Sequence, residues 1–369
     1  MILGYDAKRL FHNTSGLGNY SRTLLQDLRQ NYPENEYHLF TPSLSKQPWT
    51  NAFLNEPFLV HKPEVKIWWW RSWSLPGSFP AGLQLYHGLS HELPFTIHRS
   101  GVRSIVTIHD LIYRHFPQDF PKPDRIVYEQ KIRYALQRAH HVVAISNHTL
   151  NDIQSHYHLS PDRISVIYQA VHPLFRQMPP QKSLDATKKR FGLPENYLLY
   201  VGAISHRKNL LLVLQALHAD RRLDVPLVVI GKGKHYEQKC RQYVEANGLG
   251  KQVIWLGHVA PDQIPSLVKG ASVVIYPSLY EGFGLPVLES IMLDVPVITT
   301  SESSLPEAGG QLAHYIRGRD PAELAERLHV VLGNQKVTDS LARKEHLSRF
   351  DPVSISRQWQ DLYRKVIDD

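Results

Sequence analysis

The chain of 369 residues has little cysteine and no long apolar run. Its one cysteine, Cys240, excludes an internal disulfide framework and a metal site built from several cysteines, and it favours a reducing compartment. The N-terminal residues lack the basic segment and apolar run of a signal peptide. No window approaches the roughly 18 to 20 uncharged apolar residues that cross a bilayer. We therefore expect a cytoplasmic protein.

Acidic residues are fewer than basic ones. The 34 Asp and Glu residues face 42 Lys and Arg residues, which leaves a net charge of +8. This balance predicts an anionic partner without choosing among nucleic acid, a phosphorylated metabolite and a lipid headgroup. The length suits about two domains of roughly 150 residues each.

Short apolar runs alternate with helical patterns along most of the chain, which is typical of α/β layers. The alternation stops between residues 173 and 196, where four prolines occur, and then restarts. We therefore predict two parallel-sheet domains, over residues 1–175 and 176–352, with a last helix over 353–369. The expected strands are 1–6, 37–41, 85–88, 103–109, 141–146, 164–168, 197–202, 227–231, 253–256, 272–276 and 295–299.

The most informative segment is YPSLYEGFGLPVLE, residues 276–289. A strand is expected to end at Tyr276, and Pro286 suits the first turn of a helix. Glycines and backbone N–H groups before that helix favour a phosphate or a sugar nucleotide. Carboxylates bracket the turn and are suited to binding vicinal hydroxyls of two sugar rings. The residues concerned are Gly282, Phe283, Gly284 and Leu285, with the carboxylates Glu281 and Glu289.

This segment resembles the E-x7-E motif of retaining nucleotide-sugar glycosyltransferases of the GT-B fold, in particular glycosyltransferase family 4. The resemblance implies two Rossmann-like domains facing a cleft, with the C-terminal helix crossing back to the first domain. It implies that the first domain binds the acceptor and that the second binds the nucleotide sugar. It also implies that Glu281 contacts the donor sugar and that Glu289 binds the ribose.

A second segment, YVGAISHRKNL, places a cation pair between a strand ending at Gly202 and a helix starting near Asn209. Ligands gather at this edge of parallel sheets, and adjacent cations can neutralise a departing diphosphate. The family carries Arg followed by Lys-Asn here, which implies that Arg207 and Lys208 bind the donor diphosphate. The resemblance also implies that His258 and Val259 border the nucleotide base.

Two further matches lie in the first domain. The turn NTSGLGNY has the pattern of a glycine-rich loop after the first strand, and the family has a loop here that closes over donor and acceptor, which implies roles for Gly16, Leu17 and Gly18. A Rossmann dehydrogenase is disfavoured because Ser21 stands where the third glycine of its fingerprint would fall. In IVTIHDL, the resemblance places His109 near the transferred sugar as a catalytic group, while Asp110 is expected to orient the loop. Ser146 is expected to have a structural role only.

Two features of the sequence bear on the expected metal requirement and on the expected donor. The chain has no D-x-D triplet, which agrees with a site that needs no metal ion and no other cofactor. Asn19 stands where related mannosyltransferases commonly carry Arg, which weakens the assignment of mannose and leaves both GDP-mannose and UDP-sugars open as donors.

The segment IWWWRSW, residues 67–73, has two interpretations. Aromatic residues with interspersed cations suit a membrane interface or the headgroup of a lipid acceptor. Alternatively, Trp68–Trp73 packs on the first domain with one Trp exposed. The protein is thus either free in the cytoplasm or in peripheral contact with the inner face of the membrane.

The resemblance implies a retaining, metal-independent hexosyltransferase of bacterial surface polysaccharide synthesis. Its partners would be an NDP-sugar and a saccharide or polyprenyl-diphosphate-linked glycan, with no nucleic acid. The alternatives are an NDP-sugar 2-epimerase of the same fold, a pyridoxal-dependent phosphorylase of similar shape, and a basic binding protein without enzymatic activity.

Overall fold

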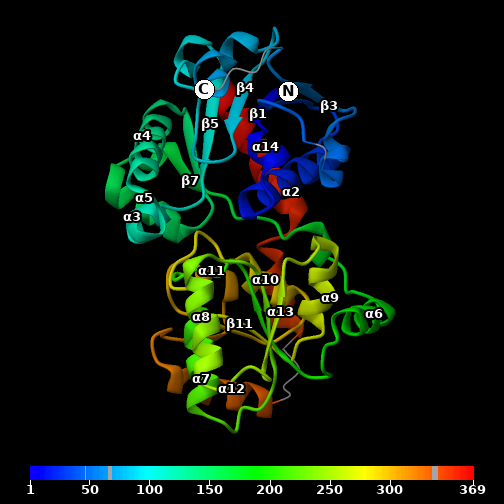
Figure 1. Ribbon diagram of the computed structural model, residues 1–369. Coiled ribbons are helices and arrows are strands. Elements are labelled where there is room, and N and C mark those ends of the chain that lie inside the picture. Colours follow the sequence, from blue (N-terminus) through cyan, green and yellow to red (C-terminus); the bar gives the residue numbers. More distant parts are fainter. Residues whose placement is uncertain (46, 65–68, 335–339) are drawn as a thin grey trace. The chain divides into compact units, whose positions relative to one another are not determined.

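The computed structural model describes residues 1–45, 47–64, 69–334 and 340–369. The chain divides into two compact units, which Figure 1 shows as separate α/β bodies. The first unit contains Met1–His172 and Arg349–Asp369, and the second contains Pro173–Ser348. These boundaries fall a few residues before the positions expected from the sequence. None of the described helices is long and apolar enough to cross a membrane.

The first unit is built on a parallel sheet with the strand order β3-β2-β1-β4-β5-β6-β7. The order reverses direction between β1 and β4, so the carboxyl ends of these two neighbours flank the topological switch point of the sheet. The strands are β1 (Ile2–Asp6), β2 (Glu36–Phe40), β3 (Phe58–His61), β4 (Leu85–Gly88), β5 (Arg103–Ile108), β6 (His141–Ala144) and β7 (Ile164–Val166).

Helices and short 3₁₀ turns connect these strands. The helices are α1 (Lys8–His12), α2 (Gly16–Asn31), α3 (Ile112–His115), α4 (Lys122–Arg138), α5 (Asn147–Tyr157) and α14 (Pro352–Asp368). The C-terminal helix α14 packs on α2 and β5, so the last residues of the chain complete the first unit. It buries Trp359 and Tyr363, and the Tyr363 hydroxyl lies 2.9 Å from Nδ1 of His87.

The second unit has a parallel sheet in the order β10-β9-β8-β11-β12-β13, with its switch point between β8 and β11. Its strands are β8 (Leu198–Val201), β9 (Leu227–Ile230), β10 (Val253–Gly257), β11 (Val273–Tyr276), β12 (Val297–Thr300) and β13 (His314–Ile316). Its helices are α6 (Gln181–Phe191), α7 (Leu210–Ala219), α8 (His235–Ala246), α9 (Ile264–Lys269), α10 (Leu285–Met292), α11 (Leu305–Gly309), α12 (Pro321–Gly333) and α13 (Ser340–Ser348).

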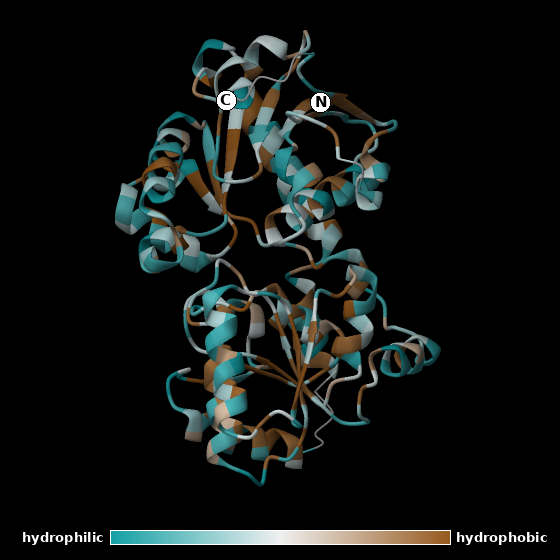
Figure 2. Cartoon of the chain, in the orientation of Figure 1, coloured by the Kyte–Doolittle hydropathy of each residue, from teal (hydrophilic) through white to brown (hydrophobic). Residues whose placement is uncertain are grey.

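The hydrophobic pattern explains this layering. Strands such as β9 and β11 are buried along their whole length, as strands of a sheet covered on both faces must be. Helix α7 is apolar on nearly every side and packs against α8 and α12. Figure 2 shows the apolar strands inside each unit and polar residues on the outer faces of the helices.

The two expected parallel α/β domains are confirmed, and the strands predicted from the sequence all exist. The sequence analysis missed the edge strands β3 and β13. Each is short, and Leu59 of β3 is 38% exposed, so neither presents the continuous apolar run that identifies a central strand.

Candidate active site

The predicted cation pair and Glu281 lie at the switch point of the second sheet. Arg207 and Lys208 belong to the loop between β8 and α7, and Glu281 belongs to the loop between β11 and α10. The backbone joins the two loops, because the amide of Leu279 donates to the carbonyl of Arg207 at 2.8 Å. The parallel register of β8 and β11 therefore brings together residues that are far apart in the sequence.

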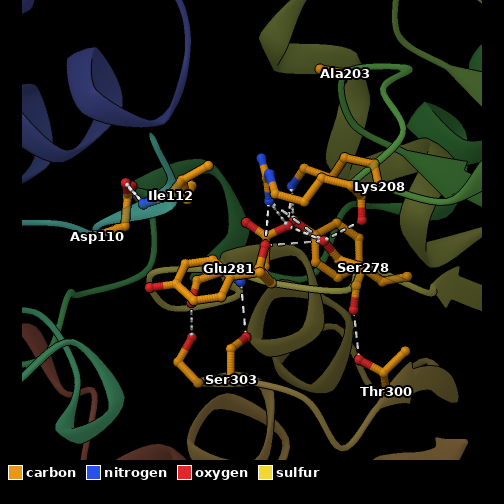
Figure 3. Close-up of polar contacts among 12 residues, drawn as sticks. Asp110, Ile112, Ala203, Lys208, Ser278, Glu281, Thr300 and Ser303 are labelled. Atoms are coloured by element: carbon orange, nitrogen blue, oxygen red, sulfur yellow. Dashed lines mark hydrogen bonds and ion pairs between the residues drawn. The ribbon is translucent and has the colours of Figure 1, made fainter. Parts of the chain in front are cut away.

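A single carboxylate oxygen organises the centre of this site. Oε1 of Glu281 lies 2.7 Å from Nη1 of Arg207 and 2.6 Å from Nζ of Lys208, and it also accepts a hydrogen bond from the Ser278 hydroxyl. Figure 3 shows these contacts meeting at Glu281. Among the described residues, Oε2 of the same carboxylate has no hydrogen-bond partner. One oxygen thus holds the ion pairs, and the other is available to a ligand hydroxyl.

The two cations of this cluster determine the protonation state of Glu281. Burial alone would raise the pKa of Glu281, but Lys208 and Arg207 outweigh it and lower the pKa to about 2. The carboxylate is therefore ionised at neutral pH. The ammonium of Lys208 lies 4.5 Å from the centre of the Tyr276 ring and donates to the Tyr276 hydroxyl. Two cations and one carboxylate leave a net positive charge at the switch point.

Three hydroxyl side chains hold the backbone around Glu281. The amide of Glu281 donates to Oγ of Ser303 at 2.9 Å, and its carbonyl accepts from Ser304 at 2.8 Å (Figure 3). Thr300 donates to the carbonyl of Ser278 at 2.6 Å. The sequence analysis did not identify these residues, because the segment TTSESSLP carries no signal beyond a turn before a helix.

The predicted phosphate-binding turn is the N-terminus of α10. Gly284 precedes the helix with φ of 109°, a conformation that glycine adopts without strain, and a Cβ there would lie 2.8 Å from a methyl group of Leu305. The amides of Gly284 and Leu285 have no partner among the described residues. Phe283 is only 3% exposed, so its side chain belongs to the core.

The second carboxylate of the motif differs from the first. Glu289 lies one turn into α10 and is half-buried, and its carboxylate has no hydrogen-bond or ion-pair partner in the described part of the chain. Burial without a compensating charge raises its pKa to about 8. A buried carboxylate that lacks partners is costly, so this side chain is suited to a ligand that supplies hydroxyl donors.

The remaining predicted residues of the second unit lie at the same edge of the sheet. Gly202 follows β8 with φ of 141°, and His258 and Val259 follow β10. The His258 side chain is exposed, whereas Val259 is buried. Their proposed contacts with a donor remain predictions.

In the first unit, His109 follows β5 and is 4% exposed. Its Nε2 lies 2.9 Å from the carbonyl of Leu89, so Nε2 carries the proton and Nδ1 is an acceptor. Burial, with His91 as a smaller cause, lowers the pKa of His109 to about 3. Asp110 accepts from the amide of Ile112 at 3.1 Å, which is the expected loop-orienting contact, and Ser146 caps α5 through the amide of Thr149.

The expected glycine-rich loop is helical in the structure, and its role in closing over donor and acceptor stays a prediction. Gly16, Leu17 and Gly18 form the first turn of α2, after the additional helix α1. The amide of Gly18 donates to the carbonyl of Ser15 at 3.0 Å. A Cβ at Gly18 would lie 1.9 Å from the carbonyl oxygen of Asn13, so this glycine permits a close backbone approach between α1 and α2.

The tryptophan segment also needs correction. Arg71 is not a surface cation: it is 8% exposed and pairs with Asp6 and Glu92. Trp70 is buried, whereas Trp69 and Trp73 are 45% and 54% exposed. Trp68 lies outside the described residues. Trp70 and Arg71 therefore pack within the first unit, whereas Trp69 and Trp73 are exposed, and contact of this segment with a membrane or a lipid acceptor stays a prediction.

No group of three or more His, Cys, Asp and Glu side chains placed to hold a metal ion occurs among the residues that the structure describes. The positively charged side chains at the switch point of the second sheet are Arg207 and Lys208.

Two parallel-sheet α/β units are the architecture of the GT-B class of glycosyltransferases. Comparison with known families specifies the class further. Residues 182–346 match the family model for glycosyl transferases group 1, and residues 14–173 match the model for Glycosyltransferase Family 4. The chain belongs to glycosyltransferase family 4.

Curated relatives are consistent with this membership. The O-antigen chain mannosyltransferase B of Escherichia coli is 31% identical over 230 residues, which cover 61% of this chain and 59% of the relative. The D-inositol 3-phosphate glycosyltransferase of Streptomyces coelicolor is 26% identical over 276 residues, covering 68% and 60% respectively. The match thus spans 59% and 60% of the length of these two relatives.

Solved structures show the same fold. The Anabaena protein Alr3699/HepE, in complex with UDP and glucose, aligns with a TM-score of 0.76 at 17% identity and covers 98% of both chains. A glycosyltransferase from Rickettsia africae aligns with a TM-score of 0.78 at 16% identity, covering 100% of this chain and 98% of the other.

Proposed function

We propose that this protein transfers a hexose from a nucleoside-diphosphate sugar, GDP-mannose or a UDP-sugar, to a saccharide or lipid-linked oligosaccharide, with retention and without a metal ion. The observation that carries the proposal is the Glu281 carboxylate, whose Oε1 holds Arg207 and Lys208 while Oε2 has no partner among the described residues. The names of the mannosyltransferase relatives favour mannose and a surface polysaccharide, and the UDP complex of a structural neighbour keeps UDP-sugars open.

The cations would bind the donor diphosphate. Arg207 offers a planar fork of donors and Lys208 a mobile point charge, and both are largely buried. Glu281 compensates part of their charge, which lowers the free-energy cost of keeping two cations at the switch point. When the bond to the sugar breaks, negative charge develops on the diphosphate, and fixed cations stabilise that charge more in the transition state than in the ground state.

The carboxylates would bind the two sugar rings. Oε2 of Glu281 would accept from a hydroxyl of the donor hexose, and Glu289 would accept from the ribose hydroxyls. The amides of Gly284 and Leu285, at the positive end of α10, would donate to the donor. Each of these contacts satisfies a group that has no partner among the described residues.

The reaction would need no side chain as general base. The bond between the anomeric carbon and the phosphate oxygen breaks, and a bond forms to the acceptor oxygen on the same face of the sugar. The acceptor proton passes to the departing phosphate oxygen. Glu281 is unsuited to remove this proton, because its ion pairs hold its pKa near 2. The role of His109 as a sugar ligand stays a prediction.

The test is a thermal-shift panel of UDP-, GDP-, ADP- and dTDP-sugars, followed by mass spectrometry of products with candidate acceptors. Stabilisation by one nucleotide family identifies the donor base. Transfer that continues in EDTA supports metal independence. Isomerisation of the donor without any acceptor would instead show an epimerase, and indifference to all four nucleotide families would contradict the proposal.

A further inference from the structure

Tyr276, the last residue of β11, is a buried phenol beside the cation pair to which the proposed function assigns no role. Its side chain is 2% exposed. Its carbonyl accepts a hydrogen bond at 2.8 Å from Oγ1 of Thr299, which lies opposite it in β12. Because β11 is paired on both sides, with β8 and with β12, the sheet fixes the backbone from which this ring projects.

The Tyr276 side chain contacts the ammonium of Lys208 in two ways. Nζ of Lys208 lies 4.5 Å from the centre of the ring, within the roughly 6 Å over which an aromatic face attracts a cation. The same ammonium donates a hydrogen bond to the Tyr276 hydroxyl. The Lys208 side chain is only 12% exposed, and both contacts are stronger where water is excluded.

Tyr276 contacts this cation without neutralising it. Burial, with the Glu281 carboxylate as a smaller cause, raises the pKa of Tyr276 well above its usual range, so the phenol stays protonated and uncharged. A second carboxylate in its place would cancel the positive charge that remains on the cluster of Arg207, Lys208 and Glu281. A neutral ring leaves that charge to act on an anionic ligand.

Of the two cations, the lysine depends more on such a contact. Its ammonium is carried on a flexible four-carbon stem, whereas the planar guanidinium of Arg207 donates to both Glu281 and the carbonyl of Tyr280. Glu281, which pairs with Lys208, is itself proposed to bind the donor sugar. The carboxylate would thus be shared between the cation and the ligand, while the Tyr276 ring would contact the cation alone.

We propose that Tyr276 is a positioning residue, whose ring and hydroxyl hold the Lys208 ammonium where the diphosphate of the donor binds. This inference rests on the proposed function, in which Lys208 binds that diphosphate. It adds a residue that acts on the reaction only through Lys208, and it separates the contribution of the hydroxyl from that of the ring face.

The experiment is a double-mutant cycle in the whole chain. Tyr276→Phe removes the hydroxyl, Tyr276→Leu also removes the ring, and each is combined with Lys208→Met. The matched controls are Tyr197→Phe and Tyr197→Leu, because Tyr197 is fully buried at the amino end of β8 and donates to the carbonyl of Leu267. One readout is kcat and KM for transfer from the donor that the thermal-shift panel identifies. The other is calorimetric affinity for the nucleoside diphosphate and for the monophosphate, whose ratio measures the contribution of the second phosphate.

We expect kcat to fall about tenfold in Tyr276→Phe, the effect of losing a hydrogen bond to a charged group, and about a further fivefold in Tyr276→Leu, the effect of losing the cation–π contact. KM should change less than kcat, because the charge on the diphosphate grows toward the transition state. The affinity ratio should fall about threefold in Tyr276→Leu. In the Lys208→Met background, neither change at Tyr276 should have a further effect on either readout. The Tyr197 variants should match the wild type.

Equal losses with and without Lys208 would show that Tyr276 only supports the fold, and they would overturn the inference while transfer by the wild type upheld the proposed function. Activity and affinity ratios in Tyr276→Leu that match those of Tyr197→Leu would overturn it as well. A Lys208-dependent loss of the affinity ratio, without transfer to any acceptor, would contradict the proposed function and leave the positioning of the cation standing. No binding of any nucleoside diphosphate would contradict both.

Discussion

Arg207 and Glu281 are joined by an ion pair of 2.7 Å between Nη1 and Oε1, although 74 positions separate them in the chain. The contact exists because β8 and β11 are parallel neighbours whose following loops meet at one edge of the sheet. It connects the two strongest sequence signals of the protein in one cluster of charges.

Replacing Arg207 by Ala should lower turnover by about 10²- to 10³-fold, the usual effect of removing a group that stabilises developing charge. The fold should persist, because Lys208 still compensates Glu281. The checks are kcat with the donor identified by the thermal-shift panel and the far-ultraviolet circular dichroism spectrum. Arg222→Ala is the matched control, since Arg222 forms an exposed ion pair with Asp220. Turnover close to that of the control would show that the cation is not needed.

Glu281 should make the protein sensitive to strong acid. Its pKa of about 2 in the folded state lies below the value of 4.5 in the unfolded state, so its contribution to stability is present above pH 4.5 and is lost as the pH falls toward 2. The difference amounts to about 3 kcal/mol. Urea unfolding of the wild type and of Glu281→Gln should therefore give free energies that converge across this window. A constant difference between them would mean that the ion pairs do not control the carboxyl group.

Glu289 should release a proton when a nucleotide binds. Its pKa of about 8 keeps much of the carboxyl protonated at neutral pH, and ribose hydroxyls that donate to it would favour the ionised form. Calorimetry with UDP or GDP at pH 7, in buffers of different ionisation enthalpy, measures this release. Glu289→Gln should bind without it. The same variant should be more stable than the wild type at pH 8, because the raised pKa destabilises the folded state as the pH rises from 4.5 through 8. Equal proton release in both proteins would assign the proton to another group.

The buried histidines of the first unit should destabilise it in mild acid. Burial lowers the pKa of His87 to about 3, that of His91 to about 4 and that of His109 to about 3. The unfolded chain therefore takes up protons below pH 6.5 that the folded chain does not, and stability falls with pH. Each histidine should contribute about 2 kcal/mol between pH 7.5 and 5. Urea unfolding at these values should show a shallower dependence for His87→Gln than for the exposed control His98→Gln, and equal slopes would contradict this account.

Removing the charge of Arg71 should destabilise the first unit. The Asp6 side chain is 1% exposed and relies on Arg71, so Arg71→Met would leave its carboxylate without compensation. Loss of one partner of a buried pair costs about 3 to 5 kcal/mol. Arg133→Met is the comparison, because the Arg133 side chain is 60% exposed and its pair with Glu129 contributes little. Similar unfolding free energies for the two variants would rule out a structural role for the buried pair.

The sequence predicts most of the fold and the centre of the candidate site. Apolar runs and their spacing identify the central strands, and strand ends of parallel sheets place Arg207, Lys208 and Glu281 on one edge. What it does not predict depends on tertiary contacts. Ser303 and Ser304 support Glu281 from the loop after another strand, β12, and no local pattern signals that contact.

The errors have the same origin. The pattern of Gly16 and Gly18 predicts a loop. In the structure, packing against α1 makes these glycines part of the first turn of α2. The sequence around Arg71 predicts a surface cation beside exposed aromatic residues. In the structure, Arg71 is buried and pairs with Asp6 and Glu92, which lie at distant positions in the chain. A charged residue in a sequence predicts an exposed side chain only when the fold brings no oppositely charged partner to it.

The return of α14 to the first unit has a consequence for synthesis. Asn31 and Asn35 bond Ser356 and Gln360, so contacts of the first unit span 325 positions. During translation the second unit emerges as a contiguous stretch and can fold while the first still lacks a helix that covers its sheet. The first unit gains its contacts with α14 only after this helix has left the ribosome, so its sheet is covered later than that of the second unit.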